Sequence, residues 1–285
     1  MSNWPEGQNA TPSFSIITPS RDQLHYLKAC VASVALQGYP HVEHVVADGG
    51  SHDGTAAYLA TSPGAIRTSR SEPDRGQSDA LNWAISRSLG EWIGWQNADD
   101  FYLAGALWRV ARVIRTFQDV HVVIGDVVLV DAEGVPTGTV GVAPVRSRRW
   151  MRGFWPYNQG VFFRRDLLAE VGPLDVDLRL HMDTDLLARI ALLGPAVAYL
   201  DVPLGAFRKH ATGKTIGGAG EPESQRERLL LEQRFGRHLW PHGATATLWH
   251  RLAFHAVRVS RFGVGSLFRR LGDRLSRVAP MAVAR

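Results

Sequence analysis

The sequence contains a single cysteine, Cys30, among 285 residues. One cysteine excludes an intrachain disulfide, and it excludes a zinc site built from several thiolates. Because disulfides are typical of oxidising compartments, their absence favours a reducing one. We therefore expect a cytoplasmic protein, and the basic C-terminal segment described below leaves open a peripheral position on the inner face of a membrane.

Long apolar runs are also missing. No run of about 18 apolar residues is present, so we expect no transmembrane helix. Residues 1–12 are polar and lack the basic-then-apolar layout of a signal peptide, so we expect a disordered leader there. The composition, 45% hydrophobic and 21% charged, is typical of a globular chain that buries a sizeable core.

Acidic residues are scarce near the C-terminus. Residues 245–285 hold eight arginines and one acid, Asp273, whereas the whole chain has a formal net charge of +5. The spacing predicts a helical, arginine-rich extension over 221–285, and a basic amphipathic helix can lie on an anionic membrane. Docking on the rest of the chain and formation of a homodimer are alternatives for 245–285. We do not favour nucleic acid as a partner.

Short apolar segments alternate with helical patterns from residue 13 onward. Residues 14–18, 44–47 and 66–69 are too short for helices and favour strands. Residues 24–37 and 55–61 lie between them and show helical apolar spacing. A strand–helix–strand–helix order predicts an α/β fold whose sheet is mainly parallel and flanked by helices.

Residues 92–100 form an apolar run that ends in two adjacent carboxylates, Asp99 and Asp100. If the run is a buried strand, both carboxylates lie at its C-terminal end, where open α/β sheets bind ligands. Two such oxygen ligands suit Mg²⁺ or Mn²⁺, usually shared with substrate phosphates. The alternative is that an aspartate caps a helix, because residues 101–117 have a helical pattern.

The second predicted strand runs directly into Asp48, Gly49 and Gly50. A carboxylate at a strand end can accept hydrogen bonds from a base or a ribose, and glycines let a ligand approach the backbone. A tight turn capped by Asp48 is the alternative. A dinucleotide-binding domain would carry its glycines after the first strand, where Pro19 and Ser20 stand instead.

Four motifs in this order resemble family 2 glycosyltransferases with the GT-A fold. They are Thr18-Pro19-Ser20, Asp48-Gly-Gly-Ser-x-Asp-Gly-Thr, Asp74-x-Gly-x-x-Asp79-Ala-Leu-Asn and Asn97-Ala98-Asp99-Asp100. The resemblance covers about residues 13–215. It implies a catalytic domain over 13–220, in which 13–117 bind the nucleotide sugar and 118–220 build the acceptor side.

The same resemblance implies the residues of the donor site. The donor contacts are Pro19, Asp48, Asp74, Asp79, Asn97, Ala98 and Asp99, with Asp48 on the nucleobase. Mn²⁺ or Mg²⁺ would be held by Asp99, with Asp100 as a second ligand. Asn97 stands where many relatives have aspartate, so one anionic ligand is missing, although an amide oxygen can still ligate a metal or bind a ribose.

Two further segments carry the resemblance into the second half. Residues 158–165 resemble the family's Q-(G/S)-x-F-F-R strand, which borders the acceptor pocket, and residues 207–215 resemble its F-R-x-H-x-x-(S)-K-T segment. The second pattern implies His210 as a third metal ligand and places basic residues near the diphosphate. Residues 217–220, which are rich in glycine, would form a flexible boundary.

An acidic pair at the start of a predicted helix supplies the candidate base. Alignment on the family's Asp-x-Asp-Leu pattern assigns Asp183 to take the proton of the acceptor hydroxyl and leaves Asp185 to support the helix. Met182 stands where some relatives have glutamate. A helix-capping pair is the alternative for these two aspartates.

The function that follows is inverting transfer of a sugar from a nucleotide-diphosphate sugar to a hydroxyl. The expected acceptor is a saccharide or lipid-linked saccharide, in cell-envelope polysaccharide or glycolipid synthesis. A nucleotidyltransferase of related fold is the first alternative, although it would have a glycine-rich basic loop after the first strand. The second is a non-enzymatic protein that binds a membrane or nucleic acid through its basic tail.

Overall fold

The computed structural model describes residues 11–142, 144–152, 156–214, 221–236 and 256. Its first half alternates strands and helices as the sequence predicts. These elements are β1 (Phe14–Ser20), α1 (Leu24–Ala35), β2 (Val42–Asp48), α2 (Thr55–Ala60), β3 (Ile66–Ser71), α3 (Gln77–Arg87) and β4 (Trp92–Trp95).

The second half mixes strands with longer connections. Its strands are β5 (Phe101–Tyr102), β6 (Val122–Val130), β7 (Pro136–Val140), β8 (Val161–Arg164) and β9 (Val197–Arg208). Its helices are α4 (Ala106–Thr116), α5 (Leu167–Val171), α6 (Met182–Leu193) and α7 (Glu221–Phe235), with 3₁₀ turns η1 (Ser147–Arg152) and η2 (Asn158–Gly160).

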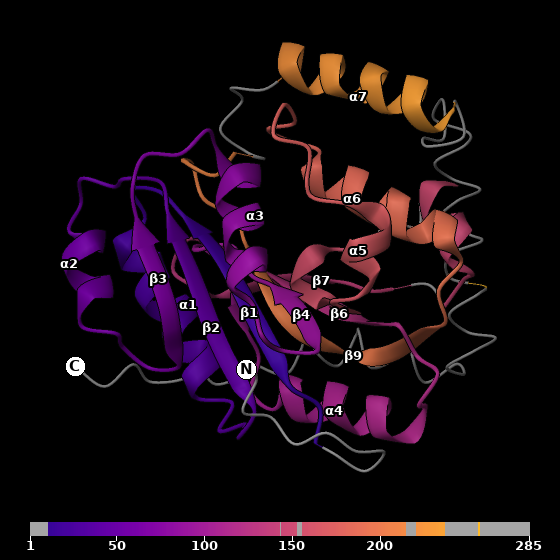
Figure 1. Ribbon diagram of the computed structural model, residues 1–285, viewed down its shortest axis with the longest axis horizontal. Coiled ribbons are helices and arrows are strands. Elements are labelled where there is room, and N and C mark those ends of the chain that lie inside the picture. The colour runs from indigo at the N-terminus through magenta and orange to yellow at the C-terminus, as the bar shows by residue number, and fades with distance from the viewer. Residues whose placement is uncertain (1–10, 143, 153–155, 215–220, 237–255, 257–285) are drawn as a thin grey trace.

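All the strands belong to one sheet with the order β3-β2-β1-β4-β8-β6-β9-β5, and β7 pairs with β6. β1 to β4 run parallel, β8 joins β4 antiparallel, and β6 pairs parallel with β9. Helices cover the sheet on both faces (Figure 1). The predicted α/β fold is confirmed, and the antiparallel partners are concentrated in the half predicted to build the acceptor side.

The strand register places the predicted donor residues at one edge. Ser20 lies opposite Asp48, and Asp48 lies opposite Ser71, so β1, β2 and β3 end together. β4 ends at Trp95, which lies opposite Ile17 of β1, and Asp99 follows a few residues later in the chain. The carboxyl ends of parallel strands therefore meet, which is where such sheets bind ligands.

The prediction of a helix over residues 101–117 is wrong at the start of that range. Residues Phe101 and Tyr102 form β5, which pairs with β9, and α4 begins only at Ala106 after Gly105 at φ +73°. Tyr102 is buried and stacks on Phe162 with ring centroids 5.3 Å apart, so packing overrides the local helical pattern. Asp99 and Asp100 therefore do not cap a helix.

Other expectations concern the ends of the chain. Pro12 is buried and its carbonyl accepts a hydrogen bond from Tyr39 Oη at 2.7 Å, so the folded part includes the end of the predicted leader. Residues 1–10, the glycine-rich segment 217–220 and, apart from Ala256, the basic segment 245–285 lie outside the described residues. Within the described residues, no helix is long and apolar enough to cross a membrane.

Glu43 ties the amino-terminal ends of β1 and β2 to the loop before β4. Its side chain is 2% exposed, and its Oε1 accepts hydrogen bonds from Ser15 Oγ, Leu89 N and Gly90 N. Arg67 donates to the other oxygen at 3.1 Å. A single carboxylate oxygen thus satisfies three donors at the edge opposite the candidate site.

Replacing Glu43 with alanine is expected to lower the free energy of unfolding by about 3 kcal/mol, because buried donors lose their acceptor. Glu43→Gln is the matched control, since its amide oxygen can still occupy the Oε1 position, and we expect a loss of about 1 kcal/mol. Urea unfolding of both variants measures the difference. Equal stabilities would show that the acceptor oxygen does not matter.

Candidate active site

Asp99 and His210 meet at the carboxyl end of β4. Asp99 follows β4 and His210 follows β9, and Asp99 Oδ2 lies 2.9 Å from His210 Nε2. The imidazole is buried, with Nδ1 against Thr212 Oγ1 at 2.9 Å and its ring 4.7 Å from that of Tyr26, whereas the Asp99 side chain keeps 18% exposure. Two of the three predicted metal ligands are therefore in contact.

Asp100 points into the protein. Its side chain is almost fully buried; Oδ1 accepts the Arg208 N–H at 2.9 Å, and Oδ2 accepts Gln159 Nε2 at 2.6 Å and Asn97 Nδ2 at 3.1 Å. Burial, followed by the charge of Asp99, raises the pKa of Asp100 to about 8. The prediction that Asp100 ligates the metal does not fit this geometry, because protein donors hold both of its oxygens.

The side chain of Asn97 also uses both of its polar atoms in hydrogen bonds within the protein. Its Oδ1 accepts Trp95 Nε1 and Gln77 Nε2, both at 2.9 Å, while its Nδ2 donates to Asp100. Gln77 Oε1 in turn accepts Lys214 Nζ at 2.8 Å. An aspartate at position 97 could not donate to Asp100, so the departure from the acidic family pattern suits this network. Because the Asn97 amide oxygen already accepts two hydrogen bonds, it is not available to ligate a metal in this structure.

Asp48 closes the turn after β2. It is buried, and Oδ2 accepts Ser51 N at 2.9 Å and Ser71 Oγ at 2.6 Å, while Oδ1 accepts Ser51 Oγ. The carboxylate therefore shapes the loop at the ends of β2 and β3, as the turn-cap alternative expected. Its contact with the nucleobase stays a prediction.

Asp74 lies against the backbone of the same turn. Its Oδ1 accepts the Gly76 N–H at 2.8 Å, and a Cβ added at Gly49 would lie only 2.9 Å from its Oδ2. Glycine at position 49 therefore allows the loop after β2 to touch the loop after β3. The structure brings these two predicted donor loops together.

The contacts of three other predicted donor residues are local, and their role in donor binding stays a prediction. Asp79, in the first turn of α3, pairs with Arg75 Nη2 at 2.7 Å, and the Arg75 guanidinium holds the pKa of Asp79 below its usual value. Pro19 lies inside β1 opposite Ala47. The Ala98 side chain packs in the core beside α1 and α2, so it would meet a donor only through its backbone.

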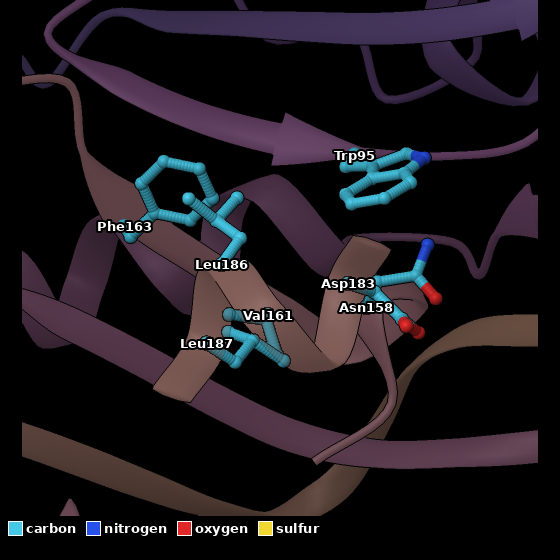
Figure 2. Close-up of a pocket in the computed structure, with 7 residues that line it drawn as sticks. All are labelled: Trp95, Asn158, Val161, Phe163, Asp183, Leu186 and Leu187. Carbon is cyan, nitrogen blue, oxygen red and sulfur yellow. The ribbon is translucent and has the colours of Figure 1, made fainter. Parts of the chain in front are cut away.

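Asp183 lies in the first turn of α6, where the sequence predicted it, and its side chain is one of those that line a small pocket. The lining residues are Trp95, Asn158, Val161, Phe163, Asp183, Leu186 and Leu187 (Figure 2). The polar ends of Asp183 and Asn158 lie on the same side as Trp95, and the aliphatic side chains and Phe163 form the rest (Figure 2). Residues of the Q-(G/S)-x-F-F-R segment thus border the pocket of the candidate base.

Burial raises the pKa of Asp183, against a hydrogen bond of 2.7 Å that Oδ1 accepts from the Thr184 N–H. Partial burial and the negative charge of Asp183 also raise the pKa of Tyr157, the residue before Asn158 of the pocket lining. Trp95 joins the two parts of the site, since it lines this pocket and donates to Asn97.

Sequence reasoning missed the side chains that hold these groups in place. Gln77, Trp95 and Gln159 each contact a residue of the Asn97–Asp100 segment, and Glu227 binds the chain just before α6. Gln159 lay within a recognised motif, although nothing in the pattern indicated its partner. Glu227 lay in a predicted charged helix with no signal that singled it out.

The profile of glycosyl transferase family 2 matches residues 15–164. A relative named PGL/p-HBAD biosynthesis glycosyltransferase, from Mycobacterium bovis, is 30% identical over 239 residues, covering 81% of this chain and 89% of that protein. The chain therefore belongs to glycosyl transferase family 2 and is a glycosyltransferase. The prediction of a family 2 glycosyltransferase is confirmed, and the nucleotidyltransferase and non-enzymatic alternatives are not.

Solved structures share the fold. S. aureus TarS 1-349 in complex with UDP-GlcNAc matches with a TM-score of 0.63 and 22% identity, over 77% of this chain and 65% of that one. The mannosyltransferase PcManGT from Pyrobaculum calidifontis, in complex with GDP-Man and Mn²⁺, matches with a TM-score of 0.52 and 21% identity over 80% of this chain and 64% of that one. The chain spans 37% of the longer TarS chain.

Proposed function

We propose that this glycosyltransferase moves a sugar, with inversion, from a nucleotide-diphosphate sugar to a hydroxyl of a saccharide or lipid-linked saccharide. The observation that carries the proposal is the contact of Asp99 with His210 at the sheet edge that also bears Asp48 and Asp74. The acceptor class, in cell-envelope polysaccharide or glycolipid synthesis, is supported by the family resemblance and by the relative named for PGL/p-HBAD biosynthesis.

Asp99 and His210 are the residues that would hold Mn²⁺ or Mg²⁺. A carboxylate oxygen and an imidazole nitrogen fit such an ion, Mn²⁺ more readily than Mg²⁺, and the solved complex of PcManGT contains Mn²⁺. Within the described residues no group of three or more His, Cys, Asp or Glu side chains could hold a metal, so diphosphate oxygens would complete the ligand set. Such an ion supplies charge neutralisation to the departing diphosphate.

Asp183 is the proposed base. It would accept the proton of the acceptor hydroxyl while that oxygen bonds to the anomeric carbon, and the bond from this carbon to the diphosphate oxygen breaks with its electron pair leaving on the diphosphate. Apolar side chains line the pocket beside Asp183. Lys214, held against Gln77, adds a positive charge on the side of Asp74 and Asp99.

A thermal-shift panel of UDP-, GDP- and dTDP-sugars, with and without Mn²⁺, tests the donor and the metal together. We expect one nucleotide class to raise the melting temperature, and to do so more strongly with Mn²⁺. A ligand at about 100 times its Kd stabilises the native state by about 2.7 kcal/mol. Mn²⁺ alone and a nucleoside triphosphate with a sugar phosphate serve as controls.

Release of the nucleotide from the selected donor, with water as acceptor, then gives a rate. We expect a chelator to abolish most of this release and added Mn²⁺ or Mg²⁺ to restore it. Without the metal, the negative charge that develops on the departing diphosphate would not be neutralised. Full release in excess chelator would refute the metal assignment. Pyrophosphate release from the triphosphate mixture would instead favour nucleotidyl transfer.

A further inference from the structure

Glu227 of α7 is a buried carboxylate that the proposed reaction does not use. It is 2% exposed, and it accepts three successive backbone N–H groups, from Arg179 at 2.6 Å, Leu180 at 3.0 Å and His181 at 2.9 Å. Glutamate is almost never fully buried unless its charge is paired or hydrogen-bonded. Three successive N–H groups form the concave arrangement that binds anions.

These N–H groups lie where the chain enters α6. His181 is the residue immediately before the helix, and no side chain of the helix start caps it. Glu227 therefore supplies, from another element, the negative charge that favours a helix N-terminus. His181 Nε2 also lies 2.9 Å from Ser224 Oγ of α7. Asp183 is only two residues further along.

A second contact fixes α7 on the other side of Asp183. Arg234 Nη1 donates to Asp185 Oδ1 at 2.7 Å, and its Nη2 donates to Asp175 Oδ2 at 2.8 Å. Asp185 is fully buried and is bound from its own helix by Arg189 at 2.7 Å. Glu227 and Arg234 are seven residues apart, about two turns, so they face the same neighbour. Figure 1 shows α7 alongside α6.

We propose that Glu227, supported by Arg234, is a positioning residue that holds the first turn of α6, and with it the Asp183 carboxylate, in place beside the Trp95 pocket. The inference rests on the proposed role of Asp183. It assigns a task to α7, which lies beyond the residues 15–164 that the family profile matches. The buried Leu231, between the two polar contacts, packs α7 onto the same core.

The test is Glu227→Gln in the full chain, measured as Mn²⁺-supported nucleotide release from the donor selected by the thermal-shift panel. Glutamine keeps the shape but turns an amide NH₂ towards backbone donors, so the first turn of α6 loses its fixed position. We expect kcat to fall about 10- to 100-fold, because a shift of about 1 Å at a reacting group costs that much. The donor KM and the donor-induced thermal shift should stay unchanged.

Glu223→Gln is the matched control on the same helix. Glu223 is partly exposed and pairs with Arg179 at 3.8 Å through its side chain, so we expect wild-type kcat. Arg234→Gln is the second variant, with an expected loss of several-fold, and it keeps the inference testable if Glu227→Gln fails to fold. Wild-type kcat in either folded variant of the pair, Glu227→Gln or Arg234→Gln, would overturn the inference.

A double-mutant cycle shows whether Glu227 acts through Asp183. In an Asp183→Asn background, Glu227→Gln should cause no further loss, because the group that it positions is already gone. If the two losses multiply, Glu227 acts elsewhere and the inference fails while the proposed function stands. If Asp183→Asn alone releases nucleotide at the wild-type rate, the proposed base is wrong, and this inference falls with it.

Discussion

Asp183→Asn is expected to lower kcat for nucleotide release by about 100- to 10,000-fold, the range that a positioned general base contributes. Asparagine keeps the size of the side chain and can still accept from the Thr184 N–H, so the start of α6 should persist. Donor binding should be unchanged, because the predicted donor residues lie on other elements. Steady-state kinetics and the donor-induced thermal shift measure the two effects separately.

Asp177→Asn is the control for this substitution. Asp177 is an exposed carboxylate in the loop before α6, so its loss should leave kcat at the wild-type value. A wild-type rate for Asp183→Asn would refute the base assignment. A loss of donor binding in that variant would instead assign Asp183 to the donor.

The pH dependence gives Asp183 a second signature. Burial raises the pKa of Asp183 above the ordinary value of 3.8. The side chain can act as a base only in its deprotonated form. Activity should therefore fall as pH drops through this raised pKa, and the midpoint of the acid limb should lie above 3.8. That limb should be absent from the residual activity of Asp183→Asn.

Asp99→Asn is expected to remove most of the Mn²⁺ dependence and to lower nucleotide release by at least about 100-fold, because metal charge stabilisation is worth several kcal/mol. Asp99 is the partly exposed member of the carboxylate pair, and its Oδ2 is the atom beside His210. Titration of Mn²⁺ against the donor-induced thermal shift measures the effect. Asp119→Asn, in the exposed turn before β6, is the control.

Asp100→Asn should behave differently from Asp99→Asn. Asp100 accepts from Arg208, Gln159 and Asn97, so an amide in its place turns an NH₂ group towards buried donors. We expect lower thermal stability, whereas folded protein should still show a donor shift that depends on Mn²⁺. Retained Mn²⁺ dependence in Asp99→Asn, with its loss in folded Asp100→Asn, would reverse the assignment of the metal ligand.

Much of the fold followed from patterns that are local in the sequence. Apolar runs and helical spacing predicted β1 to β4 together with α1 and α2, because side-chain periodicity reports which face of an element is buried. The helix over residues 101–117 was wrong at its start, since Phe101 and Tyr102 pair with β9 more than 100 residues away. No local pattern contains such a partner.

The directions of the polar side chains separated Asp99 from Asp100. Their order and spacing predicted both as ligands, yet one faces His210 and the other faces the interior. The partners that turn Asp100 inward are Gln159 and Arg208, which are 59 and 108 residues away in the chain. Asn97 belongs to the same network, because its Nδ2 donates to Asp100.

The sequence alone determined the family, the α/β fold and the edge of the sheet at which Asp48, Asp99 and His210 lie. These features depend on the order of motifs and on periodicity, both of which are written along the chain. The tertiary structure alone decided which carboxylate faces inward and how Glu227 of α7 binds the entry to α6. Those choices depend on where distant donors come to lie, because a buried carboxylate is stable only where donors surround it.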